Sequence, residues 1–329
     1  LAEAIGQGVL PTSSLQRASL RTAYLQRAAA QSEDLFSALV ASALLDQSGE
    51  AVIQAAQAAE AVTVPAPGVG PARAEEALHA ERFLTSLLRY GLLDRAYAIA
   101  RENAGLIQPQ ALMELSDALT ASGRIRESIQ VGMRIVAGDE TDHGPGGTGD
   151  LLSADVFRRR YPLGFATAFD EVLAQESIDR WVLFALVREE SLFDPEIVSR
   201  AGAIGLTQLL PATADDVARR MRIDPPDLTD PLQNLRVGAR YLAMLDAQFG
   251  GLVKAVAAYN AGQGRVRSWE RQRPDLDGVL FHQSVPFEET YNHIRNIVVS
   301  AAYYGYLYEG RSPTDTIRIV FGNLQTVGE

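Results

Sequence analysis

The chain has 329 residues, and its hydrophobic content of 47% excludes a wholly disordered protein because it is ample for a folded core. Its formal net charge of −11 at pH 7 argues against a general nucleic-acid binder, which needs a basic surface to meet phosphates. Zero cysteine excludes disulfides, thiolate nucleophiles and cysteine-based metal sites.

The first part of the chain predicts stacked helices. About the first 60 residues are rich in Ala, Leu and Gln and predict two or three helices, with a helix start at 11–14 and a Pro/Gly-rich loop at 62–72. Residues 77–105 and 111–138 each predict a helix, a glycine turn and a second helix. This pattern is similar to tetratricopeptide-type helix pairs, and an ordinary helical domain is the alternative.

A Gly-rich acidic stretch at 138–150, GDETDHGPGGTGD, is the clearest break in the chain. Its acids fit no EF-hand spacing, so we interpret it as a solvated linker. The sequence therefore predicts a helical scaffold at 1–138, a linker at 139–150, a second helical domain at 151–311 and a C-terminal extension at 312–329.

The second domain is predicted to be mostly helical, followed by an edge strand or extended tail at 315–322. Four scattered histidines without an HExxH pattern predict no metal site. No run approaches the ~20 apolar residues that span a bilayer, so no integral membrane segment is expected. No signal peptide is visible, and a processed or trimmed N-terminus is expected because the chain starts at Leu1.

Two adjacent carboxylates, Glu189 and Glu190, end an apolar helical run that extends from Val182 to Val187. Helical periodicity places each acid on an apolar stripe and does not choose between them. Burial would raise the pKa of such a carboxyl and suit it to act as a general acid. The alternative is a solvated helix end with an ion pair to Arg188.

Four blocks of sequence follow one another in a characteristic order. They are REESLFDPEIVSRAGAIGLTQLLPATA (188–214), DPLQNLRVGARYLAML (230–245), AVAAYNAGQGRV (255–266) and VPFEETYNHIRNIV (285–298). Together these blocks resemble the soluble lytic murein transglycosylases, whose catalytic domain has a goose-type lysozyme fold. The resemblance covers about residues 155–310, and the N-terminal helices are similar, less distinctly, to the superhelical domain of the large members.

The resemblance implies an all-α protein with an N-terminal α-superhelix of helical hairpins and a lysozyme-like catalytic domain. It selects Glu190, directly before Ser191, as the catalytic acid. The implied reaction cleaves the β-1,4 bond between N-acetylmuramic acid and N-acetylglucosamine and forms a 1,6-anhydro ring. One carboxylate, used first as acid and then as base, suffices for this substrate-assisted chemistry. No metal or organic cofactor is required.

The resemblance also implies substrate-binding roles for further residues. Tyr259 and Asn260 are expected to line the cleft near the reacting sugar, where Tyr259 is alternatively a packed aromatic. Gln208 is expected to bond an N-acetyl group or a sugar hydroxyl, or else to cap a helix. Ser191 is expected to orient Glu190, and Glu289 is either a second acid in the cleft or a structural ion-pair partner.

Two positions depart from the family pattern. Thr207 stands where the family usually has Met, and His293 stands where it commonly has Tyr. The first change alters an apolar floor under the sugar, and the second leaves the role of His293 open. The sequence also leaves the roles of Glu189 and Glu289 open. In the basic stretch 265–273, Trp269 is expected either to stack on a sugar or to pack in a solvated loop.

The implied partners are peptidoglycan glycan strands in a bacterial periplasm or cell envelope, with protein partners for the N-terminal helical repeats and no nucleic acid. Two other functions stay open. One is a goose-type lysozyme, which would let water reach the sugar carbon. The other is a non-catalytic glycan-binding scaffold, against which the acid at Glu190 argues, because a binding module need not retain it.

Overall fold

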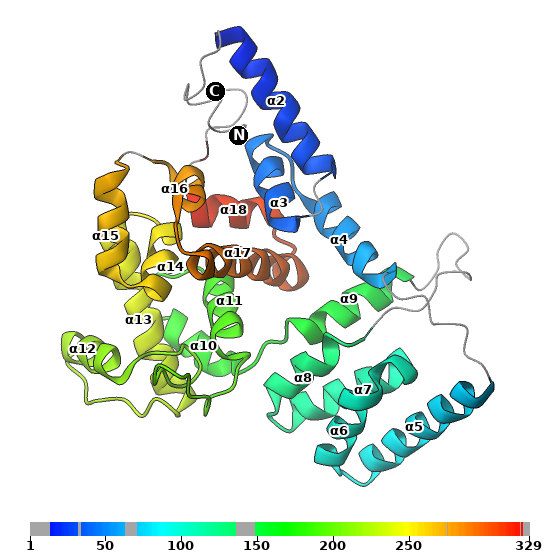
Figure 1. The fold of residues 1–329 in the computed structure, drawn as a ribbon. Coiled ribbons are helices and arrows are strands. Elements are labelled where there is room, and N and C mark those ends of the chain that lie inside the picture. The colour runs from blue at the N-terminus through cyan, green and yellow to red at the C-terminus, as the bar shows by residue number, and fades with distance from the viewer. Residues whose placement is uncertain are drawn as a thin grey trace. The chain divides into compact units, whose positions relative to one another are not determined.

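The computed structural model describes residues 14–31, 34–62, 71–135, 149–274, 276–322 and 324, and in this part of the chain the regular elements are all helices (Figure 1). The all-α prediction is therefore confirmed. Extended pairing in the described residues is limited to two isolated bridges, Val198 with Ile204 and Ile204 with Leu209. Nearly all of the linker predicted at 139–150 and of the loop predicted at 62–72 lies outside the described residues.

The chain divides into two compact units. The first comprises residues 1–53, 165–191 and 195–329, and the second comprises residues 54–164 and 192–194. These limits differ from those expected from the sequence, because the N-terminal helices group with the second half of the chain. The compact units reflect tertiary packing that composition does not reveal.

The second unit consists of helical hairpins. Its helices are α4 (Glu50–Val62, which begins in the first unit), α5 (Pro71–Arg89), α6 (Leu93–Asn103), α7 (Pro109–Ala121), α8 (Ile125–Gly132) and α9 (Gly149–Arg160), with a short 3-10 turn at Ala104–Leu106. Gly91 and Gly123 connect α5 to α6 and α7 to α8 with φ of 69° and 79°. Only glycine adopts this left-handed conformation without strain. The predicted helix–glycine–helix pattern is thus confirmed in both places.

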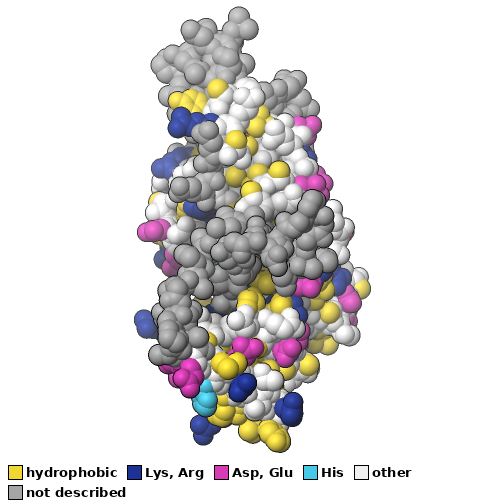
Figure 2. Space-filling view, turned by 90° about the vertical axis from the view of Figure 1, so that its right-hand side faces the viewer, with side chains coloured by type: hydrophobic (Ala, Val, Ile, Leu, Met, Phe, Trp, Pro, Cys, Tyr) yellow, Lys and Arg dark blue, Asp and Glu magenta, His cyan; other side chains and the backbone are white. Residues whose placement is uncertain are grey.

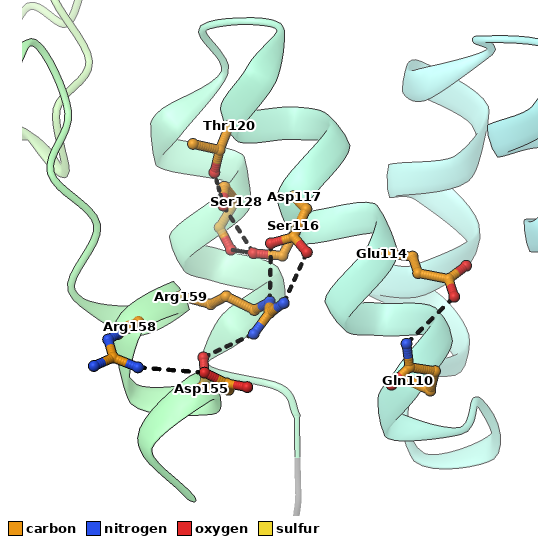
Figure 3. A network of polar contacts seen from close by, with 9 residues as sticks. All are labelled: Gln110, Glu114, Ser116, Asp117, Thr120, Ser128, Asp155, Arg158 and Arg159. Atoms are coloured by element: carbon orange, nitrogen blue, oxygen red, sulfur yellow. Dashed lines mark hydrogen bonds and ion pairs between the residues drawn. The ribbon is translucent and has the colours of Figure 1, made fainter. Parts of the chain in front are cut away.

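Polar contacts join α7, α8 and α9 within the second unit (Figure 3). The Ser128 hydroxyl on α8 lies 2.8 Å from the Ser116 hydroxyl and 2.7 Å from the Thr120 hydroxyl, both on α7. Arg159 of α9 donates to both carboxylate oxygens of Asp117, at 3.0 and 2.7 Å. This bidentate pair fixes α9 against α7 with directional bonds.

The first unit surrounds one buried helix, α11 (Arg180–Ser191). Its other helices are α2 (Ser14–Gln31), α3 (Leu35–Leu44), α10 (Ala166–Leu173), α12 (Pro211–Met221), α13 (Pro231–Phe249), α14 (Leu252–Ala261), α15 (Gln263–Gln272), α16 (Gly278–Ser284), α17 (Glu288–Glu309) and α18 (Pro313–Phe321). Helix α11 packs chiefly against α17. Phe184 of α11 stacks on Phe169 at 3.7 Å between ring centroids and contacts Tyr304 of α17 at 5.4 Å.

The edge strand or extended tail expected at 315–322 is wrong, because residues 313–321 form helix α18. Pro313 occupies the first turn, where its fixed φ and missing N–H favour a helix start. Ile317, Val320 and Phe321 recur at helical spacing and are buried. The short β-branched run suggested a strand, but burial of this one face against α17 and α3 decided the conformation.

Helix α3 completes the core of the first unit next to α17 and α18. Asp34 caps α3 by accepting from the Ser37 backbone N–H at 3.1 Å, and it forms an ion pair with Arg295 of α17. Phe36 packs on the buried His282 ring of α16 at 5.0 Å and on Phe321 of α18 at 6.0 Å. Residues distant in the sequence therefore share one aromatic cluster.

None of the described helices combines the length and the apolar content needed to cross a bilayer. On the face seen in Figure 2, acidic, basic and hydrophobic side chains are interspersed over the described surface. The described surface therefore shows no continuous basic face in that view, in line with the acidic net charge of the chain.

His282 predicts loss of stability in acid. Burial lowers its pKa to about 4, although its Nε2 lies 3.1 Å from the Tyr291 carbonyl oxygen. The folded protein then binds fewer protons than the unfolded chain between about pH 6.5 and 4, so stability falls as the pH falls through that window, by up to about 3 kcal/mol. Melting temperatures of wild type and His282→Phe between about pH 7 and 4.5 test this. The wild type should lose more than the variant, and parallel curves would contradict the assignment.

Candidate active site

Helix α11 carries two carboxylates from the core to the site. Residues 182–187 are all fully buried. Glu189 and Glu190 follow them with side chains 15% and 17% exposed. The helix cannot rotate these acids into water without exposing its apolar faces, so both stay largely desolvated.

Burial raises the pKa of Glu190 from 4.5 to about 8, and the negative charges of Glu189 and Glu289 add to the shift. Removing a carboxylate from water disfavours its charged form, and neighbouring anions disfavour it further. Glu190 therefore holds its proton at neutral pH, as a general acid must.

Glu189 has a different environment although it is the adjacent residue. Its Oε1 accepts from the Arg188 guanidinium at 2.7 Å and from the Ser300 hydroxyl of α17 at 2.7 Å. Donors of this kind stabilise an ionised carboxylate. Glu189 is thus bonded to a guanidinium and a hydroxyl group, whereas Glu190 is held as a neutral acid. Helical periodicity could not distinguish them because the difference arises from α17.

The loop at 197–209 is folded by its own polar groups. Gln208 has a left-handed φ of 49°, and its Nε2 donates to the carbonyl oxygens of Ile197 at 3.1 Å and Gly205 at 2.9 Å. Both bonds use the donor end of the amide and hold the loop closed. The structure therefore gives Gln208 a loop-bracing contact, and its predicted contact with the sugar stays a prediction.

Asn234 of α13 fastens this loop to the core. Its Oδ1 accepts from the backbone N–H and the hydroxyl of Thr207, at 2.9 and 2.6 Å. Its Nδ2 donates to the carbonyl oxygens of Ile204 at 3.0 Å and Leu228 at 2.9 Å. Asn234 and Thr207 are both completely buried, so each needs these partners. The role of Asn234 was missed, since only its place in the 230–245 block pointed to it.

Tyr259 of α14 connects the loop to the acid. Its hydroxyl donates to the Thr207 carbonyl oxygen at 2.8 Å, and its ring lies 5.2 Å from that of Tyr241. Burial and the charge of Glu190 raise the pKa of Tyr259 well above its usual value, which keeps the phenol neutral. Tyr259 and Glu190 are therefore close enough to interact electrostatically.

Three other predicted residues have distinct positions. Asn260 accepts at Oδ1 from the Thr290 hydroxyl of α17 at 2.6 Å. Ser191 is buried and donates to the carbonyl oxygens of Val187 at 3.0 Å and Leu206 at 2.9 Å, so it ties α11 to the loop. Glu289 is exposed at the start of α17, and its charge acts on Glu190.

Two aromatic or basic residues complete the surroundings. His293 of α17 places Nε2 3.4 Å from Glu190 Oε1, which the sequence alone did not assign. Trp269 is 9% exposed and meets Phe287 edge-on at 5.4 Å between ring centroids. Of the two interpretations of Trp269, the contact favours a packed aromatic. In the described residues, no three His, Cys, Asp or Glu side chains are grouped to hold a metal ion.

Comparison with known proteins shows what the segment around this site is similar to. The model of the transglycosylase SLT domain matches residues 167–281. The matched segment includes Glu190, Gln208, Tyr259 and Asn260, and its limits fall inside the first compact unit.

Curated relatives match about half of the chain or less. The soluble lytic murein transglycosylase of Escherichia coli K12 is 36% identical over 49% of this chain and 26% of its own length. That of Salmonella typhimurium is 35% identical over 46% of this chain and 24% of its own length. A membrane-bound lytic murein transglycosylase F from Alcanivorax borkumensis is 35% identical over 36% of this chain and 26% of its own. The chain thus spans about a quarter of these relatives.

Solved structures resemble a larger share of the chain. The 70 kDa soluble lytic transglycosylase of Escherichia coli covers 91% of this chain and 45% of its own, with a TM-score of 0.62 and 25% identity. An inactive mutant of the lytic transglycosylase Slt from Pseudomonas aeruginosa covers 95% and 46%, with a TM-score of 0.64 and 23% identity, and shows the fold alone. These likenesses extend beyond the SLT domain and support the combination of hairpins and lysozyme-like unit.

Replacing the neutral acid is expected to stabilise the protein. The folded pKa of Glu190 is raised, so the folded state holds a proton that the unfolded chain releases above pH 4.5, and stability falls as the pH rises toward about 8. Glu190→Gln removes this penalty, which amounts to about 2–3 kcal/mol at pH 7. Its melting temperature should exceed that of wild type by about 4 °C or more at pH 7 and by less at pH 5.

Glu189→Gln is the matched control. It weakens the bonds to Arg188 and Ser300, so it should lower the melting temperature. A gain for Glu190→Gln that does not grow with pH would contradict the buried neutral acid.

Proposed function

We propose that this protein is a peptidoglycan lytic transglycosylase that cleaves the N-acetylmuramic acid–β-1,4–N-acetylglucosamine bond without adding water. The observation that carries the proposal is a neutral, buried Glu190 at the end of α11, inside a segment that matches the transglycosylase SLT domain. Curated relatives that match about half of the chain are named as soluble lytic murein transglycosylases.

One carboxyl group suffices for the reaction. Glu190 donates its proton to the leaving glycosidic oxygen as the C1–O bond breaks, and the carbonyl oxygen of the substrate's own N-acetyl group bonds to C1. The Glu190 carboxylate then takes the proton of the C6 hydroxyl. The C6 oxygen attacks C1, the acyl oxygen leaves, and a 1,6-anhydro ring closes. Acid and base are the same group, so the site ends as it began.

The surrounding polar residues suit substrate positioning. Gln208 uses its Nε2 donor in the loop, so its Oε1 acceptor is left for an N-acetyl group or a sugar hydroxyl. Asn260 uses its Oδ1 acceptor, so its Nδ2 donor is left for the same purpose. The Tyr259 hydroxyl donates its hydrogen bond to the Thr207 carbonyl oxygen, so its own oxygen remains available as an acceptor near Glu190. Ser191 holds the end of α11 to the loop through its bond to the Leu206 carbonyl oxygen, which suits a role in orienting the adjacent Glu190. Glu289 contributes negative charge, which favours the protonated form of Glu190.

The second candidate is hydrolysis on the same fold, as in goose-type lysozymes. Its product has gained a water and ends in a reducing sugar, so product chemistry separates it from the anhydro product. A non-catalytic glycan-binding scaffold is disfavoured because a binding site gains nothing from a desolvated acid, which costs stability. The cell envelope, where peptidoglycan lies, is the proposed location, and the hairpins of the second unit are proposed to contact protein partners.

Mass spectrometry of fragments released from purified peptidoglycan sacculi tests the reaction. Wild type should release muropeptides that end in 1,6-anhydro-N-acetylmuramic acid and are lighter by one water than hydrolytic products. Glu190→Gln, which keeps the shape but cannot transfer a proton, should release at most about a thousandth as much. Glu288→Gln, one residue from Glu289 and exposed on the surface, is the control and should act like wild type.

The pH dependence gives a second readout of the same proposal. The acid form of Glu190 is lost as the pH rises through about 8, so kcat/KM should decline on the alkaline side near that value. Reducing-end products would favour the lysozyme, and the absence of release by wild type would favour the scaffold.

A further inference from the structure

A histidine faces the catalytic carboxyl from the neighbouring helix. His293 of α17 is 11% exposed, and its Nε2 lies 3.4 Å from Oε1 of Glu190, which is 17% exposed. Nε2 is itself buried and makes no hydrogen bond of good geometry in this structure. A buried polar nitrogen without a partner is costly, and the nearest group of opposite character is the Glu190 carboxyl.

The charges around His293 come from two helices. Glu189 and Glu190 lie on α11, and Glu289 lies on α17 with His293 itself. The nearby cations are engaged elsewhere, since Arg188 pairs with Glu189 and Arg295 pairs with Asp34. Tyr259 of α14 is a further titratable group near Glu190.

Burial keeps the imidazole uncharged near neutral pH. Desolvation lowers the pKa of His293, and the charges of Glu189 and Glu289 oppose this shift without cancelling it. A neutral imidazole carries one proton, on either Nδ1 or Nε2. The atom that faces Glu190 is Nε2, so the position of that proton decides what His293 can do for the acid.

We propose that His293 is a positioning residue whose Nε2–H donates to Glu190 Oε1 and so confines the acidic proton to Oε2. The proposal rests on the transglycosylase function proposed above. A carboxyl oxygen that accepts from an N–H is the carbonyl oxygen, and the proton then resides on the other oxygen. Oε2–H is thereby left to meet the glycosidic oxygen.

The same bond serves both halves of the reaction. When Oε2 has given its proton to the leaving oxygen, Glu190 is a carboxylate, and the Nε2–H bond to Oε1 becomes charge-assisted and stronger. Oε2 then accepts the proton from the C6 hydroxyl. His293 neither gains nor loses a proton, and Oε2 alone exchanges it. A donor that binds more strongly as charge develops stabilises the transition state selectively.

The tautomer is directly measurable. Long-range ¹H–¹⁵N correlation spectra of the full chain at pH 7 distinguish Nε2–H, Nδ1–H and doubly protonated rings. The chain contains four histidines, and His293→Gln identifies the signal that disappears. The proposal requires the Nε2–H form for His293. A ring protonated on Nδ1 alone, or on both nitrogens, overturns it.

Kinetics on soluble, uncrosslinked glycan strands test the consequence. His293→Phe removes the donor and should lower kcat about tenfold with KM changed less than about twofold. Its alkaline limb should move upward, because the carboxylate of Glu190 has lost a stabilising N–H. His293→Gln, whose side-chain amide supplies an N–H at a similar reach, should keep kcat within about threefold of wild type.

Each outcome bears on one of the two proposals. Equal kcat and equal pH profiles for His293→Phe and His293→Gln, with both melting near wild type, would overturn the role of His293. If wild type releases no anhydro product, the proposed function fails, whereas the tautomer measured by NMR still decides the Nε2–H···Oε1 contact. If either variant fails to fold, the tautomer in wild type remains the deciding result.

Discussion

The burial of α11 against α17 is the constraint on which the site depends. A helix whose residues 182–187 are inaccessible to water cannot turn or slide, and its last turn presents Glu189 and Glu190 in fixed directions. The packing of these apolar residues in the core therefore holds the Glu190 carboxyl in a position that is poorly solvated. Helix α17 then differentiates the two acids, because Ser300 meets Glu189 and His293 meets Glu190. Stability of the core and acidity of the site are two effects of one helix pair.

The 197–209 loop depends on hydrogen bonds in addition to the apolar packing of Leu206 and Leu209. Most of the 197–209 loop has no helical or strand hydrogen bonds of its own. Asn234 supplies hydrogen-bond partners to the Thr207 N–H and hydroxyl and to the carbonyl oxygens of Ile204 and Leu228. Gly205 has φ of 76°, and a Cβ there would lie 2.1 Å from the Leu228 carbonyl oxygen and 2.4 Å from Asn234 Nδ2 of α13. The loop can therefore pass this close to α13 and to the residues before it only without a side chain. A loop built in this way is rigid enough to position Tyr259 and Gln208.

Local patterns predicted much of this architecture from the sequence. The glycine turns at Gly91 and Gly123 and the apolar run before Glu189 follow from backbone sterics and periodicity, which are local. The helix at α18 and the grouping of α3 with the second half were not predicted, since both result from contacts between distant segments. Sequence pattern selected Glu190 only through family resemblance. The contact between His293 and Glu190 arises because α17 packs against α11, and residue spacing along a single helix cannot reveal such a contact.

The first unit is closed by bonds between segments at opposite ends of the described chain. Thr314 Oγ1 donates to the Gln47 carbonyl oxygen at 2.8 Å, Ser312 Oγ donates to that of Ser48 at 2.6 Å, and Arg318 pairs with Asp46 at 2.6 Å. During synthesis, α3 would therefore wait for α18 to leave the ribosome before its aromatic face is covered. The hairpins of the second unit rely on near neighbours and can form earlier. The hairpins of the second unit are thus expected to form first, and the packing around Glu190 to be complete only after α18 has been synthesised.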